Sequence, residues 1–166
     1  MKGGIVCAAL LLCLLPASGY GRERVAVPGT TPLYLECVLE AAQKHGLPLA
    51  ALLGILAVED GKSGEALLNS NGTWDMGRFQ INTCHVNELL AVGIRPEAIL
   101  RDGCVNAHAA AWLLRKEYKR TGNIWDAVGA YHSRTPRLRD AYIAKVRKHL
   151  DRLGKEGVAG LFGSGR

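Results

Sequence analysis

An apolar run ends in two acids and a glycine: Leu49-Ala50-Ala51-Leu52-Leu53-Gly54-Ile55-Leu56-Ala57-Val58-Glu59-Asp60-Gly61. A helix of this composition is hydrophobic on every side, so we expect it to be buried at the centre of the domain. Gly61 is expected to end the helix, which leaves Glu59 at its C-terminal tip. Partial burial disfavours the charged form of a carboxyl and raises its pKa. Glu59 therefore suits a general acid near neutral pH; the alternative is a solvated carboxylate at a helix end.

A polar segment follows a few residues later: Asn69-Ser70-Asn71-Gly72-Thr73-Trp74-Asp75-Met76-Gly77-Arg78-Phe79-Gln80-Ile81-Asn82. It contains four amide side chains, a Trp and an Asp. Amides hydrogen-bond the hydroxyl and acetamido groups of sugars, and an aromatic ring can stack on a sugar face. The segment therefore indicates a sugar-binding cleft, in which Trp74 either stacks on a sugar or anchors the loop. The alternative is a capped turn without a ligand.

Three motifs carry a family resemblance. They are Glu59, the pattern Asn71-Gly72-Thr73-x-Asp75-x-Gly77-x-x-Gln80-Ile81-Asn82, and the later Gly129-Ala130-Tyr131-His132-Ser133. With them the chain, from about Cys37 to about Lys148, resembles the soluble lytic transglycosylase (SLT) family of lysozyme-like enzymes that cleave peptidoglycan. It resembles in particular the small secreted members that serve type III or type IV secretion, conjugation or pilus systems.

The chain departs from the family pattern in two of these motifs. Asp60 stands where the family usually has Ser after the catalytic Glu. A second acid there would either raise the pKa of Glu59 further or point away into solvent. The family's usual Gly-Leu-Met-Gln is Gly77-Arg78-Phe79-Gln80 here.

The resemblance implies a reaction with one catalytic carboxyl, Glu59. Glycoside hydrolases commonly use two carboxyl groups, one of which protonates the leaving oxygen. In lytic transglycosylases the single Glu protonates the β-1,4 bridge between N-acetylmuramic acid (MurNAc) and N-acetylglucosamine (GlcNAc). It then takes a proton from the 6-hydroxyl of the same MurNAc. That hydroxyl, which is already tethered, attacks the anomeric carbon and gives a 1,6-anhydro sugar.

The resemblance also implies substrate contacts from six residues: Asp75, Met76, Gln80, Asn82, Tyr131 and His132. The Tyr131 hydroxyl would lie near the catalytic carboxyl, with an amphipathic core tyrosine as the alternative. Gln80 and Asn82 would contact the sugar or else support the turn. His132 would line the groove rather than titrate in catalysis.

Asp75 leaves another activity open. If it faces Glu59 across the groove, the two form a lysozyme-like pair and the protein is a hydrolytic muramidase; otherwise Asp75 caps a turn. A non-catalytic glycan-binding or assembly factor is a further alternative, for which Asp60 is the hint. No cofactor is expected, and the His residues do not cluster with the cysteines at metal-ligand spacing.

Residues 1–19 have the composition of a cleaved secretory signal peptide. Lys2 precedes an apolar run from Ile5 to Leu15, which is too short for a comfortable membrane span. Ala17-Ser18-Gly19 offers a cleavage site. We therefore expect a periplasmic protein without a membrane span after processing; the alternative is an uncleaved N-terminal anchor.

The remaining chain is long enough for one domain with a real core. The whole chain has a formal net charge of +6, which favours anionic partners. The cell wall carries carboxylates on its peptides, and peptidoglycan glycan strands are the expected substrate. Nucleic acid is a weaker candidate, because no nucleic-acid-binding motif is present and the compartment is wrong.

Three cysteines lie outside the expected signal peptide: Cys37, Cys84 and Cys104. In an oxidising compartment two of them should pair, and three pairings are possible. The family resemblance favours Cys37 with Cys104, and Cys84 with Cys104 is the alternative. The favoured bridge would close a loop of roughly seventy residues and stabilise the fold by roughly 2–4 kcal/mol.

Periodicity and capping residues predict a mostly helical (α+β) domain, and the resemblance implies a lysozyme-like fold. Thr31 is expected to be the N-cap of a first helix that ends at Gly46 and carries Leu39 in its apolar stripe. The only β structure expected is a brief hairpin or extended turn within residues 74–82. Further helices are expected over residues 49–60, 85–92, 96–100, 102–120, 123–131 and 136–153, the last with Tyr142 on its apolar face.

The domain is expected to span residues 31–153. Residues 20–30 and 154–166 are predicted to be flexible, because they show no periodicity or are rich in Gly. Residues 62–68 are predicted to be a link between the second helix and the polar segment.

Overall fold

The computed structural model describes residues 23–162, so the expected signal peptide lies outside the described residues. Over this range the chain forms seven α-helices and one antiparallel sheet with the strand order β1-β2-β3-β4. The strands are β1 (Arg24–Ala26), β2 (Glu65–Leu68), β3 (Trp74–Met76) and β4 (Ile81–Asn82). The helices are α1 (Leu35–His45), α2 (Leu49–Glu59), α3 (Val86–Leu90), α4 (Pro96–Arg101), α5 (Gly103–Thr121), α6 (Ile124–His132) and α7 (Pro136–Glu156). The prediction of a mostly helical fold with a minor β part is confirmed.

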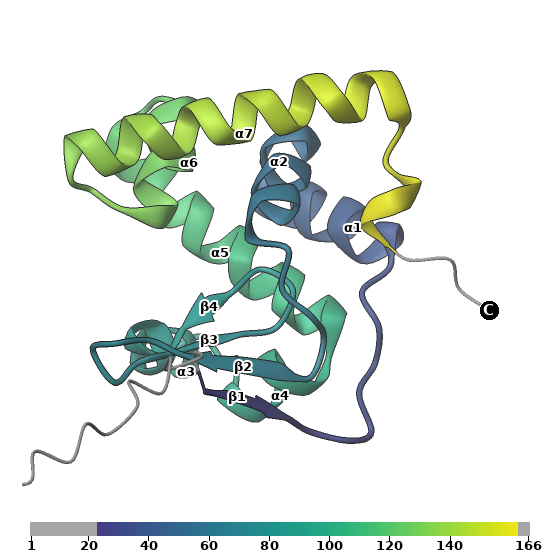
Figure 1. The fold of residues 1–166 in the computed structure, drawn as a ribbon. Coiled ribbons are helices and arrows are strands. Elements are labelled where there is room, and N and C mark those ends of the chain that lie inside the picture. The colour runs from purple at the N-terminus through teal and green to yellow at the C-terminus, as the bar shows by residue number, and fades with distance from the viewer. Residues whose placement is uncertain (1–22, 163–166) are drawn as a thin grey trace, which may run out of the picture.

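The sheet and most of the helices lie at opposite ends of the molecule. Figure 1 shows α7 lying across α2 and α6 at one end, with the sheet, α3 and α4 at the other. The long helix α5 runs between the two ends and packs against α1, α4 and α6. The chain passes from α2 directly into β2, so the C-terminal tip of α2 lies where the helical end meets the sheet.

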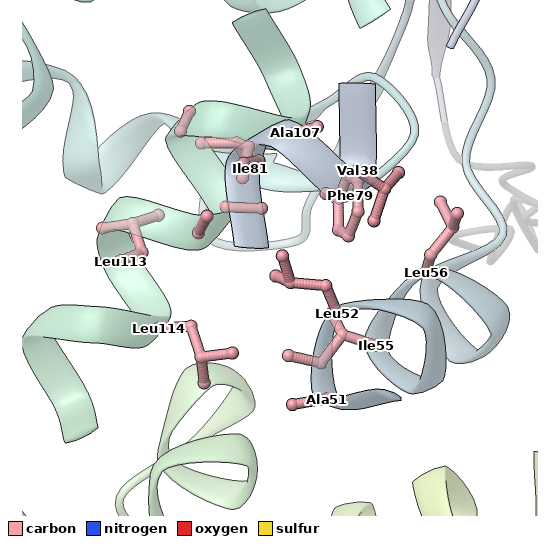
Figure 2. Packing of buried hydrophobic residues seen from close by; sticks show 14 of the residues in the cluster. Val38, Ala51, Leu52, Ile55, Leu56, Phe79, Ile81, Ala107, Leu113 and Leu114 are labelled. Carbon is pink, nitrogen blue, oxygen red and sulfur yellow. The ribbon is translucent and has the colours of Figure 1, made fainter. Parts of the chain in front are cut away.

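The central helix α2 is buried on nearly every side, as its composition predicts. Leu52, Ile55 and Leu56 have no exposed surface. Figure 2 shows Leu52 and Ile55 in the same cluster as Val38 of α1 and Leu114 of α5. Burial of these apolar side chains is the main favourable contribution to the stability of the fold.

The close packing of α7 on α2 depends on Gly54. A Cβ atom at this position would lie 2.6 Å from Cγ1 of Val146 on α7. Packing on both sides therefore fixes the axis of α2, and with it the position at which the helix presents its last residue, Glu59.

The ends of α5 follow the predicted capping chemistry. Oδ1 of Asp102 accepts hydrogen bonds from the backbone N–H groups of Cys104, at 2.8 Å, and Val105, at 3.1 Å. Gly122 ends the helix in the left-handed conformation, with φ at 68°. Asn123 then caps α6 in the same way as Asp102 caps α5. The sequence predicts both N-caps, because Asp and Asn are favoured cap residues directly before a helical pattern, and the structure confirms them.

A disulfide joins Cys37 of α1 to Cys104 in the first turn of α5, across 67 residues of sequence. This pairing is the one that the family resemblance favours, and it is confirmed. Cys84 is an exposed free thiol. The bridge holds α1 against α5 and shortens the loop that the unfolded chain could explore.

The first helix begins later than predicted, at Leu35, and Thr31 is not its N-cap. The backbone of Thr31 is paired with the junction of α4 and α5 instead. Its N–H donates to the carbonyl of Arg101 at 2.8 Å, and its own carbonyl accepts from the N–H of Gly103 at 3.0 Å. Leu39, predicted to lie in the apolar stripe, is 36% exposed.

The sheet is larger than predicted. Residues 65–68, expected to be part of a link, form β2, and β1 lies within residues 20–30, where no regular structure was expected. β1 pairs Val25 with Ala66, and β2 pairs in turn with β3. The partner of β1 lies some forty residues later in the sequence, so local composition does not reveal this pairing.

Regular structure also continues past the predicted end of the domain. α7 runs to Glu156, and a 3₁₀ turn follows at Ala159–Leu161. The guanidinium of Arg78 donates to the carbonyl of Leu161, and Leu161 and Phe162 pack against the core. The segment after α7 is thus attached to the turn between β3 and β4.

Candidate active site

Glu59 is the last residue of α2, and the C-cap is Asp60 rather than Gly61. Asp60 adopts the left-handed conformation, with φ at 43°, and its N–H donates to the carbonyl of Leu56 at 3.1 Å. The side chain of Asp60 is 86% exposed and its Oδ1 lies 4.0 Å from Nη1 of Arg78. Of the two possibilities for this departure from the family pattern, the structure shows the second, because Asp60 points into solvent.

The turn after Glu59 packs tightly against the turn between β3 and β4. A Cβ atom at Gly61 would lie 2.1 Å from the carbonyl oxygen of Gly77 and 2.4 Å from Nε2 of Gln80. Nη1 of Arg78 donates to the carbonyl of Gly61 at 2.7 Å. These contacts place the polar segment directly beside the catalytic candidate.

The Glu59 carboxyl accepts a hydrogen bond from Tyr142 of α7. The distance from the phenolic oxygen to Oε1 is 2.6 Å. The ring of His132, the last residue of α6, stacks on the ring of Tyr142 with centroids 4.7 Å apart and planes 4° apart. The sequence places Tyr142 only on an apolar helix face and gives it no part in the site, so this residue is one that sequence reasoning misses.

Burial raises the pKa of the Glu59 carboxyl from its ordinary value of 4.5 to about 7. The hydrogen bond from Tyr142 opposes this rise, the negative charge of Asp75 adds to it, and the positive charge of Lys145 opposes it. A carboxyl with a pKa near 7 is present in both protonation states at neutral pH. It can therefore donate a proton in one step and accept one in the next.

Tyr131 lies in the groove but does not form the hydrogen bond to the carboxyl. Its hydroxyl donates to the carbonyl of Phe79 at 3.0 Å. Burial, followed by the charges of Glu59 and Asp75, raises its pKa, so Tyr131 stays a neutral donor. The hydroxyl that bonds the carboxyl comes from Tyr142 instead, which lies one turn before Val146, the residue of α7 that packs on Gly54 of α2.

Successive side chains of β3 point to opposite sides of the sheet. Asp75 lines the groove, and its Oδ1 accepts a hydrogen bond from Nδ2 of Asn82 at 2.7 Å. Met76 is 5% exposed and belongs to the core. The prediction that it contacts the substrate is therefore wrong. Trp74 also packs against the core, which corresponds to an anchor rather than a sugar platform.

Gln80 and Asn82 line the groove with amides that already have partners in the protein. Nδ2 of Asn82 also donates to Oγ1 of Thr73 at 2.9 Å, and its Oδ1 accepts from the N–H of Cys84 at 2.9 Å. Gln80 has φ at 48°, and its Nε2 donates to the carbonyl of Gly77 at 2.8 Å. Both amides thus support the turn on which they lie.

The groove has a volume of about 990 Å³. It brings together nearly all of the residues that the sequence assigns to the site, namely Glu59, Asp75, Gln80, Asn82, Tyr131 and His132. A smaller hollow of about 260 Å³ shares Glu59, Leu67 and Gln80 with the groove. Glu59 therefore borders two hollows that share part of their lining.

Two further observations concern metal binding and membrane-spanning helices. Within residues 23–162, His, Cys, Asp and Glu side chains nowhere gather in threes closely enough to hold a metal ion. In the same range, every helix is too short or too polar to cross a membrane.

The family model described as "Transglycosylase SLT domain" matches residues 36–150. This match covers more than half of the chain and includes Glu59 together with the two later motifs. The chain belongs to the transglycosylase SLT family. Its membership confirms the resemblance seen in the sequence and the expectation of a lysozyme-like fold.

Several relatives of this SLT protein are also similar along most of its length. It is 31% identical to Protein IpgF of Shigella flexneri over 127 residues, which is 76% of this chain and 74% of IpgF. It is 30% identical to Invasion protein IagB of Salmonella typhimurium (strain SL1344) over 125 residues, 72% of this chain and 78% of IagB. A shorter similarity, 40% over 57 residues, links it to X polypeptide of Escherichia coli (strain K12) and covers 34% of each chain. Family and relatives together support a function of the lytic transglycosylase type.

Proposed function

We propose that this SLT protein is a peptidoglycan lytic transglycosylase. It would cleave the β-1,4 bond between MurNAc and GlcNAc and leave a 1,6-anhydro-MurNAc end. One observation carries the proposal: the Glu59 carboxyl lies in the groove, is held by Tyr142 at 2.6 Å and has a pKa of about 7. Membership of the SLT family supports the reaction class.

The reaction needs two proton transfers, and Glu59 makes both. In the first step the protonated carboxyl gives its proton to the glycosidic oxygen. The bond from C1 of MurNAc to that oxygen breaks, the electron pair stays on the departing GlcNAc, and positive charge develops on the MurNAc ring. In the second step the carboxylate takes the proton of the MurNAc 6-hydroxyl while the 6-oxygen bonds to C1. Glu59 ends protonated, as it began, and no water is consumed.

The surroundings of Glu59 fit this sequence of steps. Tyr142 bonds to Oε1, which leaves Oε2 available for the proton transfers. The carboxylate of Asp75, oriented by Asn82, contributes negative charge in the groove where the sugar ring becomes positive. Because the attacking hydroxyl belongs to the same sugar, the second step does not require a separately bound nucleophile.

A hydrolytic muramidase is the second candidate, and Asp75 is the observation that favours it. Its carboxylate lines the same groove, and its charge acts on Glu59. In hydrolysis Asp75 would activate a water or attack the ring carbon, and the product would have a reducing end. The non-catalytic alternative is less supported, because the side chain of Asp60, the residue that suggested it, faces solvent.

We also infer that the protein acts in the periplasm and opens the wall locally for a secretion, conjugation or pilus apparatus. The disulfide supports an oxidising compartment. The similarity to a Salmonella protein named for invasion supports a link to such an apparatus. Mass spectrometry of the protein isolated from the periplasmic fraction tests the location, and cleavage after Gly19 is the expected result.

The products released from isolated peptidoglycan sacculi test the activity. Digestion by the purified protein followed by mass spectrometry should give 1,6-anhydro ends. Reducing ends would establish the muramidase instead, and no release would contradict both enzymes. Glu59→Gln should lower the rate at least about 100-fold, because the amide is far too weak an acid to protonate the glycosidic oxygen. Asp60→Asn makes the same chemical change at the neighbouring exposed carboxyl and should keep the parent's activity.

A further inference from the structure

A second concave surface, with a volume of about 910 Å³, lies over the C-terminal end of α1 and the second half of α5. We call it the basic hollow, and it is lined by Gln43, Lys44, His45, Gly46, Trp112, Arg115, Lys116, Lys119 and Arg120. Five of these residues are Lys or Arg, and none is acidic. A concave surface with one sign of charge attracts ligands of the opposite sign.

Three of the cations in the basic hollow lack an acidic partner. Lys44, Arg115 and Lys119 form no ion pair with any of residues 23–162. By contrast, Lys116 is paired with Glu88 of α3, and Arg120 is paired with Glu117 of α5. The unpaired cations are thus the groups available to an anionic ligand.

The dipoles of α1 and α5 account for only some of the cations in the basic hollow. Lys44 lies in the last turn of α1, and Lys119 lies in the last turn of α5, where cations are favourable. Arg115 and Lys116 come earlier in α5, outside its last turn. Helix stabilisation therefore gives no reason for the cations in the middle of the basic hollow.

The basic hollow has a fixed frame. The Cys37–Cys104 disulfide holds α1 against α5, and Gly46 closes α1 with φ at 59°. Nη1 of Arg115 lies 3.5 Å from the carbonyl oxygen of Gly46, and Trp112 packs against the core. The side chains around the hollow are therefore presented from elements that are already tied together.

The local field is positive enough to act on a neighbouring histidine. Burial lowers the pKa of His45, and the charges of His108, Lys44 and Arg115 lower it further. The acid on the other side of His108, Glu40, lies 3.8 Å from its Nε2. An anion bound among Lys44 and Arg115 would relieve the repulsion between them.

The basic hollow adjoins the groove that contains Glu59, because Lys116 lines both. We propose that the basic hollow binds the carboxylates of the peptide stems carried by a glycan strand in the groove. This inference rests on the proposed function, which places the strand there. An extended peptide of four residues reaches up to about 14 Å. A stem of this length can extend past the side chain of Lys116, which the two surfaces share, and out of the groove. Continuity with the groove favours a stem of the bound strand over a separate acidic protein.

Binding measurements with two kinds of soluble glycan strand test the proposal. One kind keeps its peptide stems, and the other has had them removed by an amidase. The Glu59→Gln protein is used throughout, so that no strand is cleaved during the titration. It should bind stem-bearing strands about five- to tenfold more tightly than stripped strands, because each exposed ion pair contributes modestly.

A charge reversal in the basic hollow is compared with a matched reversal elsewhere. Lys44→Glu with Lys119→Glu should abolish the preference for stem-bearing strands and leave binding of stripped strands unchanged. Lys148→Glu with Lys155→Glu makes the same change in net charge on exposed positions of α7 and should keep the preference. Circular dichroism melting checks that both double variants fold.

The outcomes separate this inference from the proposed function. If the Glu59→Gln protein shows no preference for stem-bearing strands, or if the two double variants lose that preference equally, the proposed role of the basic hollow is overturned. Binding of neither kind of strand overturns both proposals. A stem preference that depends on Lys44 and Lys119, in a parent that releases no product from sacculi, overturns the transglycosylase activity and supports the basic hollow.

Discussion

The hydroxyl of Tyr142 on α7 donates a 2.6 Å hydrogen bond to Oε1 of Glu59 on α2, across 83 residues of sequence. The contact joins the last long helix to the central one at the proposed catalytic carboxyl. Burial raises the pKa of Glu59 and this hydrogen bond lowers it, and the balance is a value of about 7. Because the hydrogen bond stabilises the charged form of the carboxyl, its removal should raise the pKa of Glu59.

Tyr142→Phe should move the alkaline limb of the pH–rate profile to higher pH. The Phe ring keeps the stacking on His132 but lacks the donor, so the charged carboxylate loses stabilisation and the pKa of Glu59 rises above about 7. The limb reports the loss of the proton that the first step needs. Rates on soluble glycan strands between pH 5 and pH 9 would measure it, and an unchanged limb would show that Tyr142 does not act on Glu59.

Asp75→Asn should move the same limb in the opposite direction, to lower pH. The substitution removes a negative charge that raises the pKa of Glu59, while its carbonyl oxygen can still accept the hydrogen bond from Asn82. For a lytic transglycosylase the product stays a 1,6-anhydro sugar. A complete loss of turnover together with reducing-end products in the parent would instead identify Asp75 as the second carboxylate of a muramidase.

The sequence predicts much of this site, because its signals are local. The apolar run from Leu49 specifies a buried helix, and the acid at the end of that run is therefore half-buried. Asp102 and Asn123 predict the helix starts that the structure shows. Once β3 is known to be a strand, the alternation of its side chains also predicts that Asp75 and Met76 point to opposite faces of the sheet.

The features that sequence reasoning misses are set by contacts between distant segments. The pattern of α7 shows that Tyr142 faces inward but not that it meets Glu59. β1 is a three-residue strand whose partner lies some forty residues later, and its own composition gives no strand signal. Thr31 has a good capping side chain, but its backbone is engaged by the α4–α5 junction. In each case the outcome depends on tertiary contacts that the local sequence does not specify.

Gly61→Ala should destabilise the protein and lower its activity. The added Cβ would lie 2.1 Å from the carbonyl oxygen of Gly77, so the turn that follows Glu59 has to move, at a cost of about 1–3 kcal/mol. Denaturant unfolding and turnover on sacculi would measure the two effects. Gly154→Ala in α7 is the matched control, because no atom lies within 4 Å of its Cβ, and it should be neutral or stabilise by up to about 1 kcal/mol.

Glu59→Gln should make the protein more stable than the parent at pH 8 but not at pH 4. The folded-state pKa of about 7 lies above the ordinary value of 4.5, so the folded parent binds more protons than the unfolded chain between these values. Its free energy of unfolding therefore falls as the pH rises through that window, by about 3 kcal/mol from this group. Denaturant unfolding of both proteins at the two pH values tests this, and parallel pH dependences would contradict it.

A direct titration of Glu59 tests whether a carboxyl at the tip of a buried helix keeps its proton up to neutral pH. The side-chain carboxyl carbon can be followed by NMR in protein labelled with ¹³C at glutamate, with Glu59→Gln to assign the signal. The structure predicts a midpoint of about 7. A midpoint near the ordinary value of 4.5 would leave Glu59 without the proton that it is proposed to donate, and would contradict the proposed mechanism.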